Sequence, residues 1–180
     1  MKPPATFETP RLRLRPPDAD DAAAIFMTWA QDATVSRYTN WRPHRSLDDT
    51  RVFLHYCAEG WEHGGPFNWV IALPENGPPI GTIELRPQGH RLEMGYVLAR
   101  SWWGRGFMTE VARGLVEWAL AQPEVHRVWA VCDVENTASA RVLEKVGMER
   151  EGKLRRWASH PNVSVAPRDC WCYARVKETT

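Results

Sequence analysis

The sequence predicts an α+β domain of mixed αβα layers, built on a mostly antiparallel sheet. Three observations support this prediction. An alternating segment opens the chain, three strand-like segments with short turns between them occupy its middle, and helices with apolar stripes separate the later strands. A length of 180 residues suits one domain, because typical domains hold about 100 to 200 residues. We therefore expect one folding unit over residues 1–180.

The first third of the chain predicts a strand followed by two helices. Polar and apolar residues alternate in 11–15, which predicts a strand whose two leucines face inward. Asp18 is expected to cap a helix that reaches about Gln31. A second helix is expected to begin after Ser46, in a Ser-x-x-Asp capping box, and to end at Gly60.

A loop over 35–45 separates these two helices and carries Tyr38, Trp41 and His44. Such side chains in a loop suit recognition of a ligand. They equally suit a loop that packs on its own aromatic residues. Both interpretations stay open at this point.

The rest of the chain predicts a meander and then helices alternating with strands. Periodicity and turn residues, including the Pro- and Gly-rich turn 74–79, set the boundaries. Strands are expected over 67–73, 80–86, 91–99, 126–133, 149–157 and 169–176, and helices over 107–122 and 137–146.

Composition and charge exclude several classes of function. Lys and Arg number 23 and Asp and Glu 22, so the net charge of +1 draws the chain to neither nucleic acid nor an anionic membrane. The first residues lack an apolar signal segment, and no run of about 18 apolar residues occurs, which predicts a soluble cytoplasmic protein. The cysteines lack the spacing of a zinc site, so we expect no metal; they are Cys57, Cys132, Cys170 and Cys172.

One turn offers a binding site on the residues alone. Gly104 and Gly106 lie between a strand and a helix, where unpaired backbone N–H groups and the positive end of a helix dipole would meet, as a phosphate site requires. The alternative is a tight turn that only joins the two elements. A dinucleotide-binding fold is disfavoured, because the third glycine of its fingerprint is missing and the turn follows an antiparallel meander.

Short motifs follow one another along nearly the whole chain, and they are Thr9-Pro10-Arg11-Leu12, Ile80-Gly81-Thr82-Ile83, Glu93-Met94-Gly95-Tyr96, Trp103-Gly104-Arg105-Gly106-Phe107-Met108-Thr109-Glu110, Asn136-Thr137-Ala138-Ser139 and Glu144-Lys145-Val146-Gly147-Met148. Their order and spacing resemble the GNAT acyltransferase superfamily, and within it the RimJ/RimL-like N-acetyltransferase branch. The resemblance implies the GNAT fold, with six to seven strands, a splayed parallel pair at the centre of the sheet and about four helices. It also implies transfer of an acetyl group from acetyl-CoA to a primary amine, on a protein or peptide N-terminus or on a small molecule.

The resemblance assigns the pyrophosphate of acetyl-CoA to backbone N–H groups of the glycine turn, namely Gly104, Arg105, Gly106, Phe107, Met108 and Thr109. The side chain of Arg105 would contact a phosphate or point to solvent. Two of the three positions of the family's loop motif depart from it, at Trp103 and Met108. These departures weaken the match to the motif. They do not remove the expected phosphate contacts, because those contacts come from backbone N–H groups.

The pantetheine arm, by the same resemblance, lies between two splayed strands. It would bind the backbone of Tyr96, Val97 and Leu98 on the first strand, with 126–133 as the second. An N–H group of the first strand would stabilise the oxyanion that forms when an amine attacks the thioester. Asn136 is expected to hydrogen-bond the pantetheine; its residue type equally suits a cap for the following helix.

The proton donor and the base are less well defined. Many family members carry a tyrosine at the position of Leu143, and the RimL-like branch offers a serine at the position of Ser139, which we take as the candidate proton donor for the leaving thiolate. The alternative is an ordinary serine on a helix surface. A glutamate base known from one branch is replaced here by Val131.

Glu93 is the candidate base, followed by Asp169 and Asp133, and each could instead serve in a salt bridge or a cap. None of the six histidines shows motif spacing. A catalytically idle acyl-CoA-binding module, regulatory or partner-binding, is the alternative function. Transfer of a longer acyl group is a third hypothesis, which depends on the space near Val97, Cys132 and Leu143. The amine acceptor and the oligomeric state stay open, a homodimer included.

Overall fold

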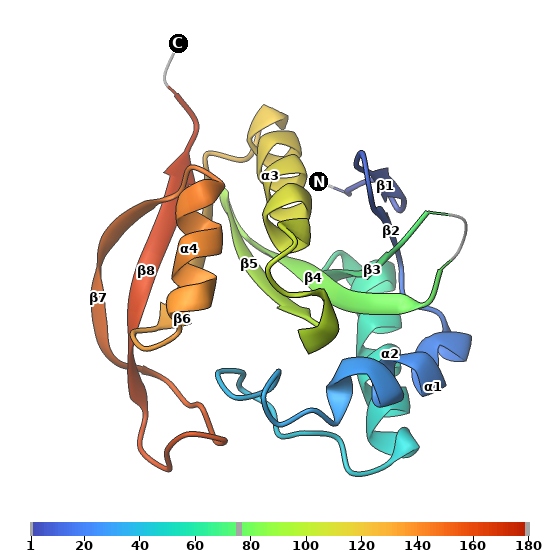
Figure 1. Ribbon diagram of the computed structural model, residues 1–180. Coiled ribbons are helices and arrows are strands. Elements are labelled where there is room, and N and C mark those ends of the chain that lie inside the picture. The colour runs from blue at the N-terminus through green and yellow to red at the C-terminus, as the bar shows by residue number, and fades with distance from the viewer. Residues whose placement is uncertain (1, 75–76, 179–180) are drawn as a thin grey trace.

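A computed structural model describes residues 2–74 and 77–178, and in this described part eight strands and four α-helices form the fold (Figure 1). The strands are β1 (Phe7–Glu8), β2 (Arg13–Arg15), β3 (Phe67–Ala72), β4 (Pro79–Gln88), β5 (Arg91–Leu98), β6 (Arg127–Asp133), β7 (Glu149–Ala158) and β8 (Arg168–Val176). The helices are α1 (Ala22–Ile25), α2 (Leu47–His63), α3 (Phe107–Ala121) and α4 (Thr137–Lys145). The expected α+β class is confirmed, and the strand count exceeds the prediction because the two-residue β1 adds a pairing with β2.

The strands form one sheet in the order β1-β2-β3-β4-β5-β6-β8-β7, and all neighbours are antiparallel except β5 and β6. This parallel pair is joined only where Arg91–Glu93 lies beside Arg127–Trp129. Past Glu93, β5 keeps its pairing with β4 as far as Leu98 but has no pairing with β6. The expected splayed parallel pair is thereby confirmed, because the backbones of the two strands separate toward their C-terminal ends (Figure 1); we call this unpaired stretch the opening.

Gly81 allows the backbones of β4 and β5 to approach closely beside this opening. A Cβ atom on Gly81 would lie 2.5 Å from the carbonyl oxygen of Val97, so no larger residue fits without a shift of the backbone. The glycine of the Ile80-Gly81-Thr82-Ile83 motif therefore fixes the position of the strand that borders the opening.

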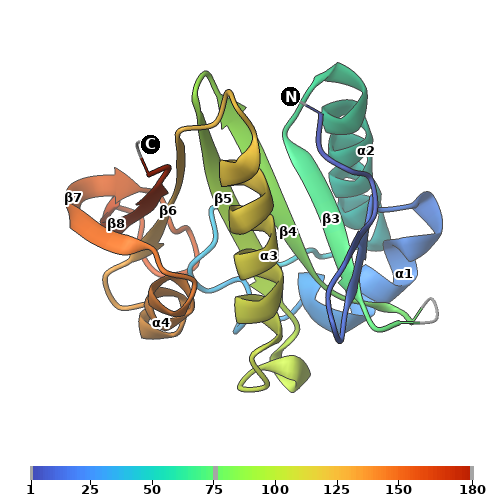
Figure 2. The same cartoon turned by 90° about the horizontal axis from the view of Figure 1, so that it is seen from above.

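Helices cover both faces of the sheet. Figure 2 shows α3 and α4 on one face and α2 on the other. The face under α3 packs on a large apolar cluster that includes Trp69, Leu115 and Tyr173. A second cluster on the other face joins α1, α2 and β3 through residues such as Ile25, Leu54 and Val70. Within the described residues, none of the helices combines the length and apolar character needed to cross a membrane.

The first helical segment differs from the expected single helix. Asp18 does cap it, since its side chain accepts the N–H of Asp20 at 2.9 Å and the carboxylate of Asp21 accepts the N–H of Asp18 at 2.7 Å. The chain then passes from a 3₁₀ turn over Ala19–Asp21 through the short α1 to a π turn over Phe26–Ala30. The prediction was therefore right about the start and wrong about the regularity of this helix.

The predicted end of α2 was also wrong. The helix has the expected Ser46 capping box, but it continues to His63 and ends at Gly64, which has a left-handed φ of 89°. Gly60 lies inside the helix and is buried. Only glycine fits here, because a Cβ atom would lie 2.0 Å from the carbonyl oxygen of Pro66. This glycine permits a close contact between helix and chain. The other predicted elements agree to within a few residues, and residues 75 and 76 of the predicted turn 74–79 lie outside the described part.

Candidate active site

Two hydroxyl groups meet at the opening between β5 and β6. Tyr96 projects from β5, and Ser139 lies in the first turn of α4, the helix that follows β6. Their hydroxyl oxygens are 2.8 Å apart, and the Tyr96 hydroxyl also lies 3.3 Å from the carbonyl oxygen of Ser139. The sequence pointed to Ser139, but for Tyr96 it pointed only to the backbone. Its side chain was missed because 43 residues separate the pair and no local pattern joins them.

The protonation of Tyr96 suits a donor of protons or hydrogen bonds. Burial raises the pKa of Tyr96 well above its ordinary value of 10.0, and the hydrogen bond with Ser139 offsets only part of this rise. The phenol therefore stays protonated at neutral pH. Leu143, which replaces the tyrosine of many family members, is fully buried in the main core.

The glycine turn between β5 and α3 is open to solvent. Gly104 and Gly106 have φ values of 75° and 76°, a left-handed conformation that favours glycine, and residues 103–106 are exposed. No side chain in the described part of the chain caps α3, whose first residue is Phe107. The first N–H groups of a helix have no partner within it. The turn therefore leaves donors free at the positive end of a helix dipole, as an anion site requires.

Trp103, one of the two positions that depart from the family's loop motif, holds the turn through its side chain. Its indole N–H donates to the carbonyl oxygen of Leu98 at 2.6 Å, which ties the turn to the end of β5. The ring of Trp102 stacks on Phe107 with a centroid distance of 5.7 Å, and the guanidinium of Arg105 lies 4.7 Å from the Trp102 ring centroid. Trp102 therefore packs against residues on both sides of Gly106 and helps to hold the turn in place.

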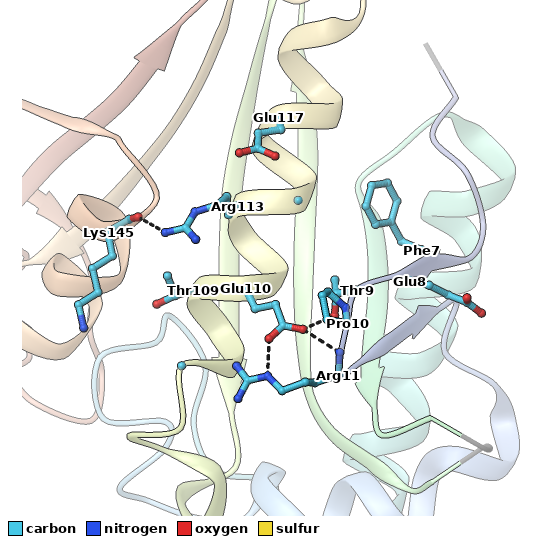
Figure 3. A pocket seen from close by; sticks show the side chains of 12 residues that line it. Phe7, Glu8, Thr9, Pro10, Arg11, Thr109, Glu110, Arg113, Glu117 and Lys145 are labelled. Carbon is cyan, nitrogen blue, oxygen red and sulfur yellow. Dashed lines mark hydrogen bonds and ion pairs between the residues drawn. The ribbon is translucent and has the colours of Figure 1, made fainter.

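The motif at the start of the chain also supports this turn (Figure 3). Glu110, in the first turn of α3, accepts hydrogen bonds from the Thr9 hydroxyl at 2.6 Å, the Arg11 backbone N–H at 3.0 Å and the Arg11 Nε at 2.6 Å. Arg11 also donates to the carbonyl oxygen of Arg105 at 3.1 Å. Burial alone would raise the pKa of Glu110, but these hydrogen bonds outweigh it and lower the pKa. The Thr9–Leu12 motif thus holds the start of α3 and the glycine turn together, a connection that the sequence did not reveal.

A cavity of about 510 Å³ lies on the outer side of α3, between the segment from Phe7 to Arg11 and Lys145 of α4 (Figure 3). Gly106 and Thr109 form part of its wall, so the cavity adjoins the glycine turn. Arg113 crosses toward α4 and donates to the carbonyl oxygen of Lys145 at 2.7 Å. The wall of the cavity carries charges of both signs, with Glu8, Glu110 and Glu117 beside Arg11, Arg113 and Lys145.

Asn136 caps α4, since its side-chain oxygen accepts the N–H of Ser139 at 3.1 Å. This cap fixes the backbone of Ser139 and so helps to hold its hydroxyl near Tyr96. The described residues contain no group of three or more His, Cys, Asp or Glu side chains that could hold a metal ion.

Glu93 lies at the point where β5 and β6 begin to separate. Its carboxylate accepts a hydrogen bond from Gln88 at 2.9 Å and lies 3.4 Å from Arg86. Side chains alternate along a strand, so Glu93 and Tyr96 project from opposite faces of the sheet. Val97, on the face of Glu93, packs on the α1 and α2 cluster. Glu93 therefore faces the α2 side of the opening and is not in contact with Ser139.

The two secondary base candidates hold the backbone. The Asp133 side chain is fully buried at the end of β6 and accepts hydrogen bonds from Arg168 and from the backbone N–H of Glu135. Burial alone would raise the pKa of Asp133, but these bonds outweigh it and hold the pKa below 3.8. Asp169 accepts the backbone N–H of Arg156 at 2.9 Å and pairs with Lys153.

The loop between the first helical segment and α2 packs partly on its own aromatic residues. Trp41 and His44 have ring centroids 5.5 Å apart, and His44 Nδ1 lies 2.8 Å from the Thr50 hydroxyl. Burial lowers the pKa of His44. Tyr38 instead turns toward His160 of the loop between β7 and β8, with ring centroids 6.4 Å apart. Packing explains Trp41 and His44, whereas Tyr38 takes part in a contact between loops.

The open sheet with its splayed parallel pair is the fold class of the acetyltransferases that the sequence motifs resemble. The family model described as acetyltransferase (GNAT) domain matches residues 11–149, and the chain belongs to this family. It is 31% identical over 174 residues to the uncharacterised N-acetyltransferase YoaA of Bacillus subtilis, covering 95% of this chain and 96% of that protein.

Solved structures share the fold. A GNAT-family acetyltransferase from Bacillus anthracis superimposes with a TM-score of 0.83 at 27% identity, covering 97% of this chain and 99% of that one. RimL, the ribosomal L7/L12 α-N-protein acetyltransferase solved with coenzyme A, gives a TM-score of 0.82 at 20% identity and covers 96% of each chain. The resemblance to the GNAT superfamily is thereby confirmed, and RimL shares the fold.

Proposed function

We propose that this protein transfers an acetyl group from acetyl-CoA to a primary amine, on a protein or peptide N-terminus or on a small molecule. Transfer occurs by direct attack within a ternary complex. The observation that carries the proposal is the contact of the Tyr96 and Ser139 hydroxyls across the opening between β5 and β6. The related RimL was solved with coenzyme A, which supports the choice of cosubstrate.

The cosubstrate would bind through the backbone along one path. Amides of the turn and of the first turn of α3, from Gly104 to Thr109, hold the pyrophosphate. The edge of β5 that β6 leaves unpaired, along Tyr96, Val97 and Leu98, binds the pantetheine arm. Asn136, which caps α4 through its side-chain oxygen, would hydrogen-bond the same arm.

The chemistry needs one proton removed and one delivered. The amine nitrogen attacks the thioester carbon and the carbon–sulfur bond breaks, while an N–H of β5 stabilises the oxyanion. Ser139 gives its proton to the departing thiolate, and Tyr96 replaces that proton across their 2.8 Å contact. Glu93 takes the proton of the amine, directly or through water, and passes it to solvent, from which Tyr96 is reprotonated.

A thermal melt and a thiol assay test this function. Acetyl-CoA is expected to raise the Tm, because a ligand that binds only the folded state stabilises it. With a panel of peptides and amines, a thiol reagent should detect free coenzyme A that depends on both enzyme and acceptor. Failure of acetyl-CoA to bind would reject the proposal. Binding without thiol release for any acceptor would identify an idle acyl-CoA-binding module instead.

A further inference from the structure

Two segments that lie far apart in the chain meet below the opening between β5 and β6 (Figure 1). The side-chain amide of Asn162, between β7 and β8, donates to the carbonyl oxygens of Ser36 at 2.7 Å and Trp41 at 2.8 Å. The contact of Tyr38 with His160 adds to this junction. Residues 33–47 and 152–168 therefore form one continuous surface, which we name the cationic face.

The charges within the two segments of the cationic face are of one sign, and acidic residues lie just outside their ends, at Asp32, Asp48, Asp49, Glu151 and Asp169. The two segments contain seven Lys and Arg residues and no Asp or Glu, although the whole chain holds 23 and 22 of these types. The rest of the chain therefore has an excess of acidic residues. Two of the seven cations are already paired, Lys153 with Asp169 at 2.9 Å and Arg168 with Asp133.

The other five cations are exposed arginines. Within residues 2–74 and 77–178, none of their guanidinium groups forms an ion pair with a carboxylate; they are Arg37, Arg42, Arg45, Arg155 and Arg156. Positive charges gathered on one face repel one another and attract anions from solution. Binding of a negatively charged ligand to this face would relieve the repulsion among its positive charges.

A β-bulge directs part of this charge outward. Residues 155–157 interrupt the register of β7 with β8, and Arg156 has a φ of 50°, a left-handed value that is uncommon for arginine. Asp169 holds the bulge through the N–H of Arg156 at 2.9 Å. Trp157, next in the chain, is 54% exposed. Bulges redirect side chains beside functional sites, and here two arginines and a tryptophan face solvent together.

The cationic face adjoins the reaction centre. His160 Nε2 lies 3.7 Å from the carboxylate of Asp133, the last residue of β6, and the chain reaches Ser139 in the following helix. The glycine turn lies instead at the start of α3, beyond the end of β5. The cationic face and the glycine turn are therefore separate surfaces, and His160 brings the cationic face next to the end of β6, from which the chain leads to Ser139.

We propose that the acceptor is a peptide whose residues next to the free N-terminus are acidic, and that the cationic face binds those residues. The proposal rests on the proposed acetyl transfer and names its substrate class. Arginine pairs well with carboxylates in a bidentate geometry. A peptide is favoured over nucleic acid because an α-amine has a pKa near ~8 and is nucleophilic when neutral, whereas base amines are conjugated with their rings.

Titration calorimetry tests binding separately from catalysis. The protein, saturated with coenzyme A, is titrated with a hexapeptide of free N-terminal serine followed by three glutamates, and with its glutamine counterpart. The acidic peptide is expected to bind at least about tenfold more tightly at low salt, and the difference should shrink at high salt because exposed charges are screened. The triple variant R42Q/R155Q/R156Q should lose about tenfold in affinity for the acidic peptide only.

The control is R91Q, which removes one exposed cation at the far end of β5 and should bind both peptides as the parent does. Equal affinity for the two peptides, or an unchanged preference in the triple variant, would overturn the proposal. So would a single-stranded oligonucleotide of equal charge that binds as tightly as the acidic peptide. Acetyl transfer is tested by thiol release in parallel, so peptide binding without release would refute the proposed function and leave the acidic preference established.

Discussion

The hydroxyl oxygens of Tyr96 and Ser139 lie 2.8 Å apart, one on β5 and the other on α4. We predict that they act as one unit. Each of Y96F and S139A should lower kcat by about 100-fold, in the range of general acid catalysis. The double variant should be little slower than either single one, because residues of one hydrogen-bonded unit are not additive. Steady-state kinetics of the three variants decides this, and additive losses would show two independent roles.

Arg11 should matter for the affinity of acetyl-CoA rather than for the chemical step. It binds Glu110 and the carbonyl oxygen of Arg105 and so holds the glycine turn. We expect R11Q to raise the Kd of acetyl-CoA about three- to tenfold in titration calorimetry. R51Q is a matched control, because Arg51 forms an equally short but exposed ion pair with Asp48 on α2. Similar losses in both variants would argue against a positioning role for Arg11.

Glu93 should influence turnover without affecting the fold. Its partner Arg86 keeps a second carboxylate, Glu84, at 2.6 Å, so E93Q leaves no unpaired arginine. We expect a loss in kcat of at least about tenfold that becomes smaller as rising pH deprotonates the amine, with an unchanged Kd for acetyl-CoA. If E93Q lowered kcat by the same factor at every pH, this result would contradict the role of Glu93 as a base.

Gly60 should be intolerant of any side chain. A Cβ atom there would lie 2.0 Å from the carbonyl oxygen of Pro66, whereas nothing lies within 4 Å of a Cβ atom on Gly152. We predict that G60A lowers the free energy of unfolding by about 3 kcal/mol, since the backbone must move to relieve the contact. G152A, measured by the same urea denaturation, should change it by less than about 1 kcal/mol.

Asp133 should make stability depend on pH in the acid range. Its folded pKa lies below the ordinary 3.8, so its ion pair with Arg168 stabilises the fold fully above about pH 5 and loses this effect as pH falls through the folded pKa. D133N should be about 3 kcal/mol less stable at pH 7, and its stability should fall less between pH 5 and pH 2. D48N, at an exposed pair, serves as control. Parallel curves for D133N and the parent would refute this role.

Local patterns in the sequence were sufficient for most of the elements. Alternation placed Leu12 and Leu14 in the core, where they are 1% and 0% exposed, and the Ser46 capping box located the start of α2. Gly60 misled the prediction because a glycine that ends a helix and one that admits a neighbouring segment look alike in sequence. Only the position of Pro66 in space distinguishes them.

The candidate site was predictable where the backbone alone forms it. The glycine turn combines strand, loop and helix within a few residues, so its position followed from local order. The Tyr96 side chain and the link from Thr9 and Arg11 to Glu110 could not be found in this way, because each joins segments whose proximity depends on the whole sheet. The grouping of arginines on the cationic face likewise became evident only once Asn162 was seen to join its two segments.

Among the residues that the structure describes, β5 and β6 pair only from Arg91–Arg127 to Glu93–Trp129, and the His126 N–H donates to the carbonyl oxygen of His90 just before this pairing. The sheet is therefore divided into two halves whose strands pair along a short line, while one apolar cluster continues beneath both halves. Acetyl-CoA bound as proposed would take the place of a neighbouring strand along the unpaired edge of β5 and so connect the two halves. Hydrogen exchange along the unpaired edge of β5 should then slow when the cosubstrate is present, and the two halves should lose their protection together instead of separately.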